Sequence, residues 1–357
     1  MSWNAVDAVD DAVEATRRFL FPVSLVRWAK LSVLVLLMGG SAGTNAPVSA
    51  FQNPASLVES DGIETDPLGE TTGVVPDPIA GIGSVDTDLI LAVAAVVVVA
   101  VVAVSIASLS LRLAYYDALR TNDVRLWRPF LDRLPQAVGL FAFTTALNLL
   151  VASLIAVAVL AGTTVGWSPA DALGSAVVGL PTWTLGVLGV CSVVVVLVGL
   201  LALRFTREFV VPVMVLWDRG VLAGWRRFWA TLRGSWTEFL VYLLVHLLLG
   251  VGISLAESFV FVFLGGLVAV FAGVVVLIAA GLLGGLPALT GSAAGTAFLA
   301  VVVVLALVAL VLLLLPIRVV TRTYLITYEV STLAGVDPRL AMLDSSIDPK
   351  MPGETPG

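Results

Sequence analysis

Three stretches of this chain carry no charged residue for eighteen or nineteen positions, and they constrain its fold more than any other feature. They span residues 89–107, 185–203 and 298–315. A helix of that length suffices to cross a hydrocarbon core of about 30 Å. Backbone polar groups have no water partner inside a bilayer, so helices are expected, and the alternation of a membrane barrel is absent. The chain is therefore predicted to be an all-α, polytopic transmembrane helix bundle.

The composition supports a membrane location and excludes several kinds of site. Hydrophobic residues make up 59% of the chain and charged residues 12%, whereas charged residues make up about a quarter of a soluble domain. The single cysteine, Cys191, cannot form an intramolecular disulfide, and the single histidine is His246. A zinc site with several His or Cys ligands is therefore excluded, and we predict neither a metal nor a cofactor.

Residues 3–18 are predicted to form an amphipathic cytoplasmic helix that lies near the membrane surface. Val6, Val9 and Val13 fall on one face at helical spacing, and the acidic residues fall elsewhere. We accordingly divide the chain into this cytoplasmic helix (1–18), a transmembrane domain (19–335) and a disordered cytoplasmic tail (336–357).

Two kinds of connection are expected within the transmembrane domain. Residues 42–88 contain eight acidic residues and no Lys or Arg, which predicts a long acidic loop outside the cell. Residues 112–135 and 205–236 are basic and are predicted to be amphipathic interface elements on the cytoplasmic side.

The first predicted span, at residues 20–41, is interrupted by Arg27 and Lys30. Both side chains can extend to the inner membrane surface from the first turns of the span. The alternative is a secretory signal that is cleaved after residues 48–50, although a signal normally begins with a short basic region and not with an acidic helix.

The distribution of basic residues predicts the topology. All nineteen Lys and Arg residues lie in four segments, at 17–30, 112–133, 204–233 and 318–350. The positive-inside rule places all four in the cytoplasm, and six spans with both termini inside satisfy it.

Residues 237–285 leave the number of spans open between six and seven. As one straight helix they would be about 73 Å long, more than twice the hydrocarbon thickness. We therefore expect a break near residues 250–257 or 265–266. Two crossings by this block would give seven spans and would place the last basic segment outside.

Three predicted spans end in similar sequences. Arginine follows the apolar run, with Phe or Tyr one to three residues later, in "SLRLAYY" (110–116), "RFTREF" (204–209) and "RVVTRTY" (318–324). The two basic elements also share Trp-Arg-x-Phe, in "LWRPFLDRL" (126–134) and "GWRRFWATL" (224–232). Such likeness is expected of an internal duplication, which is common among transporters. It is also what arginine and aromatic residues produce at any membrane interface.

Residues 209–236 combine tryptophans and arginines in the pattern of a helix lying in the membrane interface. On a helical wheel the tryptophans gather with Val221, Phe228 and Leu232 on one face, and arginines recur every seven residues on the other. The tryptophans would dip into the acyl boundary, and the arginines would face lipid phosphates or form a specific anion or headgroup site. The predicted lipid or anion interface consists of Arg219, Arg226, Arg227, Arg233, Trp217, Trp225, Trp229 and Trp236.

Part of this stretch, "PVMVLWDRGVLAGWRRFWATLRGSW" (212–236), resembles a signature of the membrane domain found in some glycerophosphodiester phosphodiesterases. The chain, with its opening "SWNAVDAVDDAVEATRRFLFPVSLVRWAKL" (2–31), also resembles haloarchaeal multipass membrane proteins of unknown function, and seventeen Arg against two Lys agree with that origin. The resemblance implies a fold and a membrane location but no activity, because the phosphodiesterase chemistry belongs to a separate soluble barrel. The residues that match the signature are Pro212, Asp218, Gly220, Arg226, Arg227, Arg233, Gly234 and Trp236, whereas Asp218 replaces a frequent glutamate and Phe228 a frequent serine.

A few polar residues fall inside predicted spans. His246, Ser254 and Glu257 would share one face of a helix, and Asn148 lies in another span. Ionisable groups in a span are candidates for proton or ion passage. The alternative is that His246 and Asn148 make polar contacts between packed helices and that Glu257 reaches the outer headgroups.

No recognisable catalytic motif is present. The chain contains neither a phosphate-binding glycine loop, nor His-Glu-x-x-His, nor Gly-x-Ser-x-Gly, and we expect no catalytic residue and no enzyme activity. We predict a multipass protein of the cell membrane that organises the membrane, interacts with lipids or assembles with membrane-protein partners, without binding nucleic acid. The alternative is a transporter or exporter of a small solute or ion.

Overall fold

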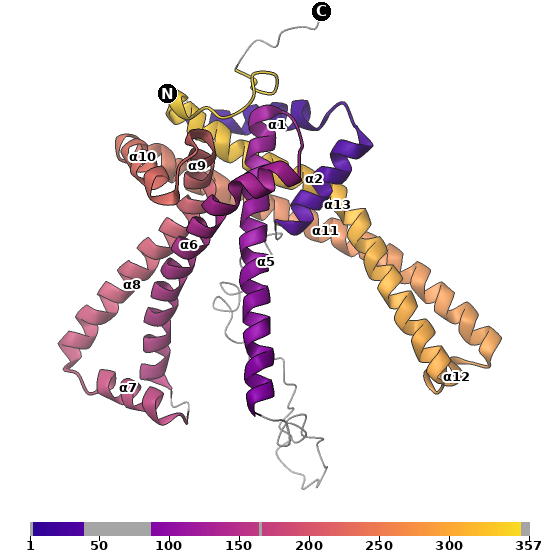
Figure 1. Ribbon diagram of the computed structural model, residues 1–357. Coiled ribbons are helices and arrows are strands. Elements are labelled where there is room, and N and C mark those ends of the chain that lie inside the picture. The colour runs from indigo at the N-terminus through magenta and orange to yellow at the C-terminus, as the bar shows by residue number, and fades with distance from the viewer. Residues whose placement is uncertain (1–2, 39–86, 164–165, 351–357) are drawn as a thin grey trace, which may run out of the picture.

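The computed structural model describes residues 3–38, 87–163 and 166–350, and within them every regular element is helical (Figure 1). Much of the predicted acidic loop, residues 42–88, lies outside the described residues. The elements are α1 (Asn4–Leu20), α2 (Leu25–Leu37), α5 (Thr87–Thr121), α6 (Trp127–Gly162), α7 (Ser168–Val178), α8 (Thr182–Phe205), the π-helix η2 (Thr206–Val210), α9 (Val211–Trp217), α10 (Val221–Gly234), α11 (Trp236–Leu283), α12 (Leu286–Thr290), α13 (Ala293–Val336) and the 3-10 helix η3 (Pro338–Leu340).

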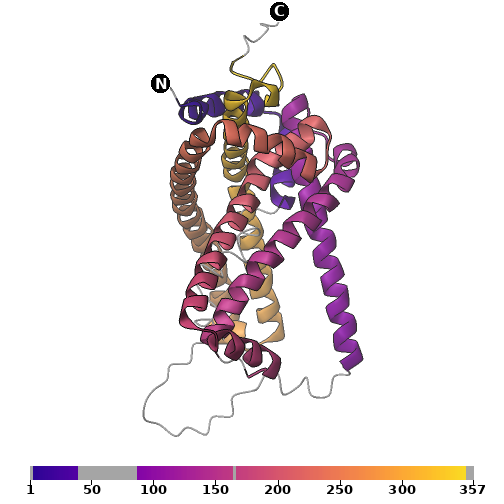
Figure 2. The same ribbon diagram turned by 90° about the vertical axis from the view of Figure 1, so that its left-hand side faces the viewer.

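The molecule has a packed base from which long helices diverge (Figures 1 and 2). We call base the assembly of α1, α2, η2, α9, α10 and η3 with the adjoining ends of the long helices. We call arms the remainder of the long helices: α5 alone, the hairpin of α6 and α8 closed by α7, and the hairpin of α11 and α13 closed by α12. Both ends of the described chain lie at the base.

Five helices among the described residues are long and apolar enough to span a membrane, and they coincide with five of the six predicted spans. These are residues Leu91–Thr121, Trp127–Gly162, Thr182–Trp217, Trp236–Leu283 and Ala293–Val336. Helix α2, in the first predicted span, is not one of them, because its 13 residues extend only about 20 Å. The structure thus shows an all-helical protein with five helices capable of spanning a membrane.

The predicted break in residues 237–285 is wrong. Helix α11 runs without interruption over 48 residues, and Figure 2 shows it as one curved helix. The helix can be longer than the hydrocarbon core is thick because its first turns belong to the base, where Phe239 and Tyr242 are buried. The block contains no proline to remove a backbone hydrogen bond, and space is open around its paired glycines, Gly265 and Gly266.

Helix α1 packs through alanines and not through the predicted valine face. Ala5, Ala8 and Ala12 are fully buried and share the packed side with Ala15, while Val6 is 49% and Val13 is 55% exposed. Alanines let the backbone of α1 approach α13 closely enough for the Tyr328 hydroxyl to donate to the Ala5 carbonyl at 3.1 Å. Val6 and Val13 are left on the outer side of the helix, whereas Val9 packs partly against the core.

The C-terminal segment that we predicted to be disordered is folded as far as residue 350. Leu340, Met342 and Ile347 are buried in the base. The amide of Asp344 donates to the Leu119 carbonyl at the end of α5, at 3.3 Å. Burial of these apolar residues attaches the segment to the base.

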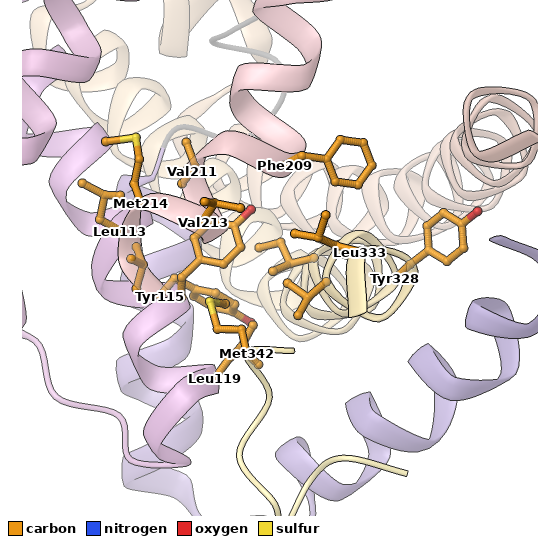
Figure 3. Close-up of a cluster of buried hydrophobic side chains, with 14 of the residues drawn as sticks. Leu113, Tyr115, Leu119, Phe209, Val211, Val213, Met214, Tyr328, Leu333 and Met342 are labelled. Atoms are coloured by element: carbon orange, nitrogen blue, oxygen red, sulfur yellow. The ribbon is translucent and has the colours of Figure 1, made fainter. Parts of the chain in front are cut away.

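The core of the base joins segments that are far apart in the sequence (Figure 3). Buried side chains from α5 meet those of η2 and α9 and those of α13. The hydroxyls of Tyr115 and Thr323 are hydrogen-bonded at 2.6 Å within this core. The side chains labelled in Figure 3 are Leu113, Tyr115, Leu119, Phe209, Val211, Val213, Met214, Tyr328, Leu333 and Met342.

Ala12→Leu is expected to destabilise the protein, because the added carbons would force α1 away from α13 at a position with no free space. Overpacking of this kind costs about 1–3 kcal/mol. The measurement is thermal unfolding of the full-length protein in mild detergent. Val13→Leu, on the exposed side of the same helix, is the control and should change the midpoint little; equal effects of the two variants would contradict the packing described here.

Candidate functional site

Two buried glutamates lie at the centre of the base, Glu208 in η2 and Glu329 in α13. Arg204 donates from Nε to one oxygen of Glu208 at 3.0 Å, and the Tyr242 hydroxyl donates to the other at 3.0 Å. The Nε2 atom of His246 lies 3.6 Å from the first oxygen. The Glu208 carboxylate therefore connects the end of α8 with α11.

Glu329 forms the second half of this cluster. Tyr116 in α5 donates from its hydroxyl to Glu329 Oε2 at 3.1 Å. The ring of Tyr328, next to Glu329 in sequence, stacks on that of Tyr242 with centroids 5.5 Å apart. The Tyr242 hydroxyl is also 2.8 Å from His246 Nδ1. Groups from α5, η2, α11 and α13 thus meet in one polar network, which we call the glutamate network.

The π-helix η2 positions Glu208 and its neighbour Phe209. A π-turn inserts one residue into a helix, and such turns are frequent at functional sites. Here the turn follows directly on α8, and its first residue is fixed from two sides: the Thr206 hydroxyl donates to the Ala202 carbonyl at 2.6 Å and accepts from Trp225 Nε1 at 3.0 Å. Both Glu208 and Phe209 are buried as a result.

The glutamate network offers a metal ion three donors, one each from Glu208, His246 and Glu329, whose ligand atoms lie within 4.8 Å of one another. Both oxygens of Glu208 are already engaged by Arg204 and Tyr242. A divalent ion would have to displace the arginine and bear its repulsion. We therefore interpret the cluster as an ion-pair network that holds helices together.

Helix α10 is amphipathic, and part of its predicted lipid-facing side packs into the base. Phe228 is fully buried, stacked on Phe209 at 5.3 Å between centroids. Trp225 is held by its bond to Thr206, and a Cβ at Gly224 would lie 3.0 Å from Val210 and from Met214, which shows how closely α10 approaches. Val221, Trp225 and Phe228 of the predicted lipid-facing side therefore contact protein, whereas Trp229 and Trp236 of the same side are exposed.

The structure brings together part of the predicted anion interface. Arg219, Arg227 and Trp217 line a cavity of about 150 Å³ beside α10. The guanidinium of Arg227 lies over the Trp217 ring at 5.1 Å, and that of Arg233 over the Trp229 ring at 5.5 Å. Arg226 and Trp236 are exposed and lie outside this cavity.

The connection before α10 is fixed by Asp218, one of the residues that match the phosphodiesterase signature. Asp218 ends α9 in a left-handed conformation, with φ of 50°. Arg133 in α6 donates to it at 2.7 Å and also makes a two-point contact with Asp117 at 2.7 and 2.8 Å. This pair of carboxylates orients α9 and α10 against the start of α6.

The predicted intramembrane polar residues do not share one site. His246 belongs to the glutamate network, whereas Glu257 accepts from the Thr321 hydroxyl of α13 at 2.6 Å. Ser254 and Glu257 line a cavity of about 510 Å³ between α11 and α13. Asn148 is exposed on α6 and donates to the Thr144 carbonyl of its own helix at 2.8 Å, so it makes no interhelical bond.

Sequence reasoning missed Glu208 and Glu329. The sequence contained a signal for both, since Glu208 lies within the span end at 204–209 and Glu329 lies five residues after the span end at 318–324. An acid at such a place, where a helix leaves the membrane beside arginines, favours a buried ion pair.

Glu208→Ala is expected to lower the stability by about 3–5 kcal/mol, because it leaves Arg204 and Tyr242 without their buried partner. The measurement is again thermal unfolding in detergent. Glu14→Ala removes a half-exposed pair with Arg18 and is the matched control, for which a loss below about 1 kcal/mol is expected. Similar losses for both variants would show that the glutamate network does not hold the base together.

Comparison with curated proteins and with solved structures found no match. The resemblance to the phosphodiesterase membrane domain and the haloarchaeal origin remain predictions. One protein-family profile matches residues 3–343, and so covers both the base and the arms. On the strength of this match along nearly the whole chain, the protein belongs to the family of unknown function DUF7544.

Proposed function

We propose that this protein is a non-catalytic multipass membrane protein whose arms enclose lipid or the helices of a membrane partner. The observation that carries the proposal is the contrast in packing between base and arms. In the most apolar window of each of the five candidate spans, at most 6% of residues are buried inside the protein. The base, by contrast, buries a continuous core.

This contrast has a physical meaning in a bilayer. Apolar faces gain little by leaving lipid for one another, so helices there associate through close packing and polar contacts. The arms are lined by large side chains such as Val99, Phe259 and Leu305, which are well exposed. Such faces favour lipid or partner helices as neighbours, and they supply no group for catalysis.

We further propose six crossings with both termini in the cytoplasm. The basic segments lie at the base, which the positive-inside rule assigns to the cytoplasm. The sixth crossing is the one predicted at residues 20–41, which contain α2, and α5 begins at the end of the molecule opposite the base. A C-terminal tag should be protected from protease in sealed right-side-out vesicles, and its digestion there would refute this orientation.

The separation of the arms is testable with the single native cysteine. Cys191 is exposed on α8, and Val304→Cys on α13 provides a second labelling site. Spin labels on this pair in phosphatidylcholine nanodiscs are expected to give distances well above the about 10 Å between the axes of packed helices.

The control is Glu257→Cys with Thr321→Cys in a Cys191→Ala background, because these two residues are in contact in the structure. That pair should give a short distance. A short distance for the first pair as well would mean that the arms close on each other, and it would contradict the proposal.

Transport is a second candidate function, and the cavity between α11 and α13 favours it. Ser254, Glu257, Ser258 and Arg318 give this cavity of about 510 Å³ a polar wall at the inner end of the spans. The duplication that would support transport finds less support, since the two Trp-Arg-x-Phe segments differ in position: Trp127 begins α6 itself, whereas Trp225 lies in the separate helix α10.

If the protein transports protons, Glu257→Gln should reduce the flux at least about tenfold, because the amide cannot exchange a proton in the cavity. The measurement is the response of a pH-sensitive dye inside proteoliposomes. Glu14→Gln, at the surface of the base, is the control. Equal flux through wild type and Glu257→Gln would exclude a proton route through this cavity.

A further inference from the structure

The three similar span ends converge in space. Arg112 follows the apolar part of α5, Arg207 lies in η2 after α8, and Arg322 lies in α13. Nη2 of Arg112 donates to the Arg207 carbonyl at 3.1 Å. The positive charges of Arg112 and Arg207 repel each other, and so do those of Arg112 and Arg322. Arginines from three separate helices therefore form one positive cluster, which we call the arginine cluster.

Positive charge exceeds negative charge around this cluster. Five arginines (Arg112, Arg204, Arg207, Arg318 and Arg322) face three glutamates (Glu208, Glu257 and Glu329), a difference of two positive charges. Arg204 is paired with Glu208. Within the described residues, the guanidinium groups of Arg207 and Arg322 form neither a hydrogen bond nor an ion pair, although Glu208 attracts the first and Glu257 and Glu329 attract the second.

A buried nitrogen atom of Arg112 gives stronger evidence that the cluster binds an anion. The Nε of Arg112 is buried and has no hydrogen-bond acceptor within the described residues. A buried donor without an acceptor, like a buried charge without a counter-charge, is costly. The arginine cluster is therefore suited to bind an anion that accepts hydrogen bonds and neutralises part of the excess positive charge.

The position of the arginine cluster indicates which kind of anion it binds. Arg112 follows directly on an apolar run, and Arg207 and Arg322 lie about one turn beyond Arg204 and Arg318, which follow the other two runs, so all three lie near the depth of lipid phosphates. Below them the arms diverge and leave apolar faces exposed (Figure 1). A free phosphate would neutralise the arginines but leave those faces bare, whereas a phospholipid supplies both a phosphate and acyl chains.

We propose that Arg112, Arg207 and Arg322 bind the phosphate of an anionic phospholipid whose acyl chains lie between the arms. The site rests on the proposed function and names the class of lipid that the arms enclose. The phosphate oxygens would accept from Nε of Arg112 and from the guanidinium groups of Arg207 and Arg322. Glu329 and Glu208 of the glutamate network attract Arg112 and help to hold it in place.

The test compares lipids by thermal unfolding of the full-length, delipidated protein in mild detergent. Phosphatidylglycerol is expected to raise the unfolding midpoint more than phosphatidylcholine or inorganic phosphate does. The double variant Arg207→Gln/Arg322→Gln should need at least about tenfold more phosphatidylglycerol for the same shift, since it loses charge-assisted hydrogen bonds to the phosphate. Arg128→Gln/Arg339→Gln, which removes two exposed arginines of the base, is the matched control and should respond as wild type does.

A measurement without lipid separates lost binding from misfolding. The double variant should then unfold near the wild-type midpoint, because the lost repulsion of Arg112 offsets the lost attraction to Glu208, Glu257 and Glu329. A lower midpoint without lipid, an equal lipid response in both double variants, or an equal effect of phosphatidylcholine would each overturn the proposal. An equal effect of inorganic phosphate would also overturn it and would assign the cluster to a free anion.

The outcome is distinguishable from failure of the proposed function. The spin-label distance between Cys191 and Val304→Cys is measured in phosphatidylcholine, which carries no net charge. Separated arms without a preference for phosphatidylglycerol would reject the arginine cluster as a lipid site and leave the enclosing arms intact. A short spin-label distance, which means that the arms are closed, would contradict both the lipid site and the proposed function.

Discussion

The arrangement of this protein depends on the burial of Glu208 among groups from other helices. Its carboxylate accepts from Arg204 and Tyr242, and Tyr242 in turn contacts His246 and stacks on Tyr328. Breaking one side of a buried pair leaves an uncompensated charge, so the groups hold one another in register. Because these residues lie on α8–η2, α11 and α13, one network fixes where the long helices leave the base, and the directions of the arms follow from it.

Under the proposed function, the packed base and the open arms reflect two different solvents. At the base, water drives apolar side chains together, and α1, α10 and the C-terminal segment are all attached by burial of apolar surface. Along the arms, hydrocarbon replaces water and removes that driving force, so valine and leucine faces stay apart without penalty. The glutamate network and the arginine cluster lie at the border, where charges can still be paired but are no longer freely hydrated.

Local sequence patterns predicted the helices better than they predicted which surfaces those helices pack against. The apolar runs located five of the spans, and the tryptophan-rich stretch at 209–236 contains an amphipathic helix, α10. The face that α10 buries was assigned to lipid because a helical wheel cannot tell acyl chains from protein. The alanines of α1 have the same spacing as its valines, and only the close approach of α13 favours the smaller side chain. The break expected in α11 assumed that a helix ends with the bilayer, whereas this helix continues into the base.

The sequence by itself determined that the chain is helical, that it belongs in a membrane and which of its segments are basic. These properties depend on composition and on periods of a few residues, which any window of the chain displays. Only the tertiary structure decided that Glu208 meets Tyr242 and that Arg112, Arg207 and Arg322 form one cluster. Such contacts join residues from separate helices, and their geometry depends on how all the helices pack at once. The similar span ends were visible in the sequence as a repetition, but their convergence, and with it the surplus of positive charge, exists only in the folded base.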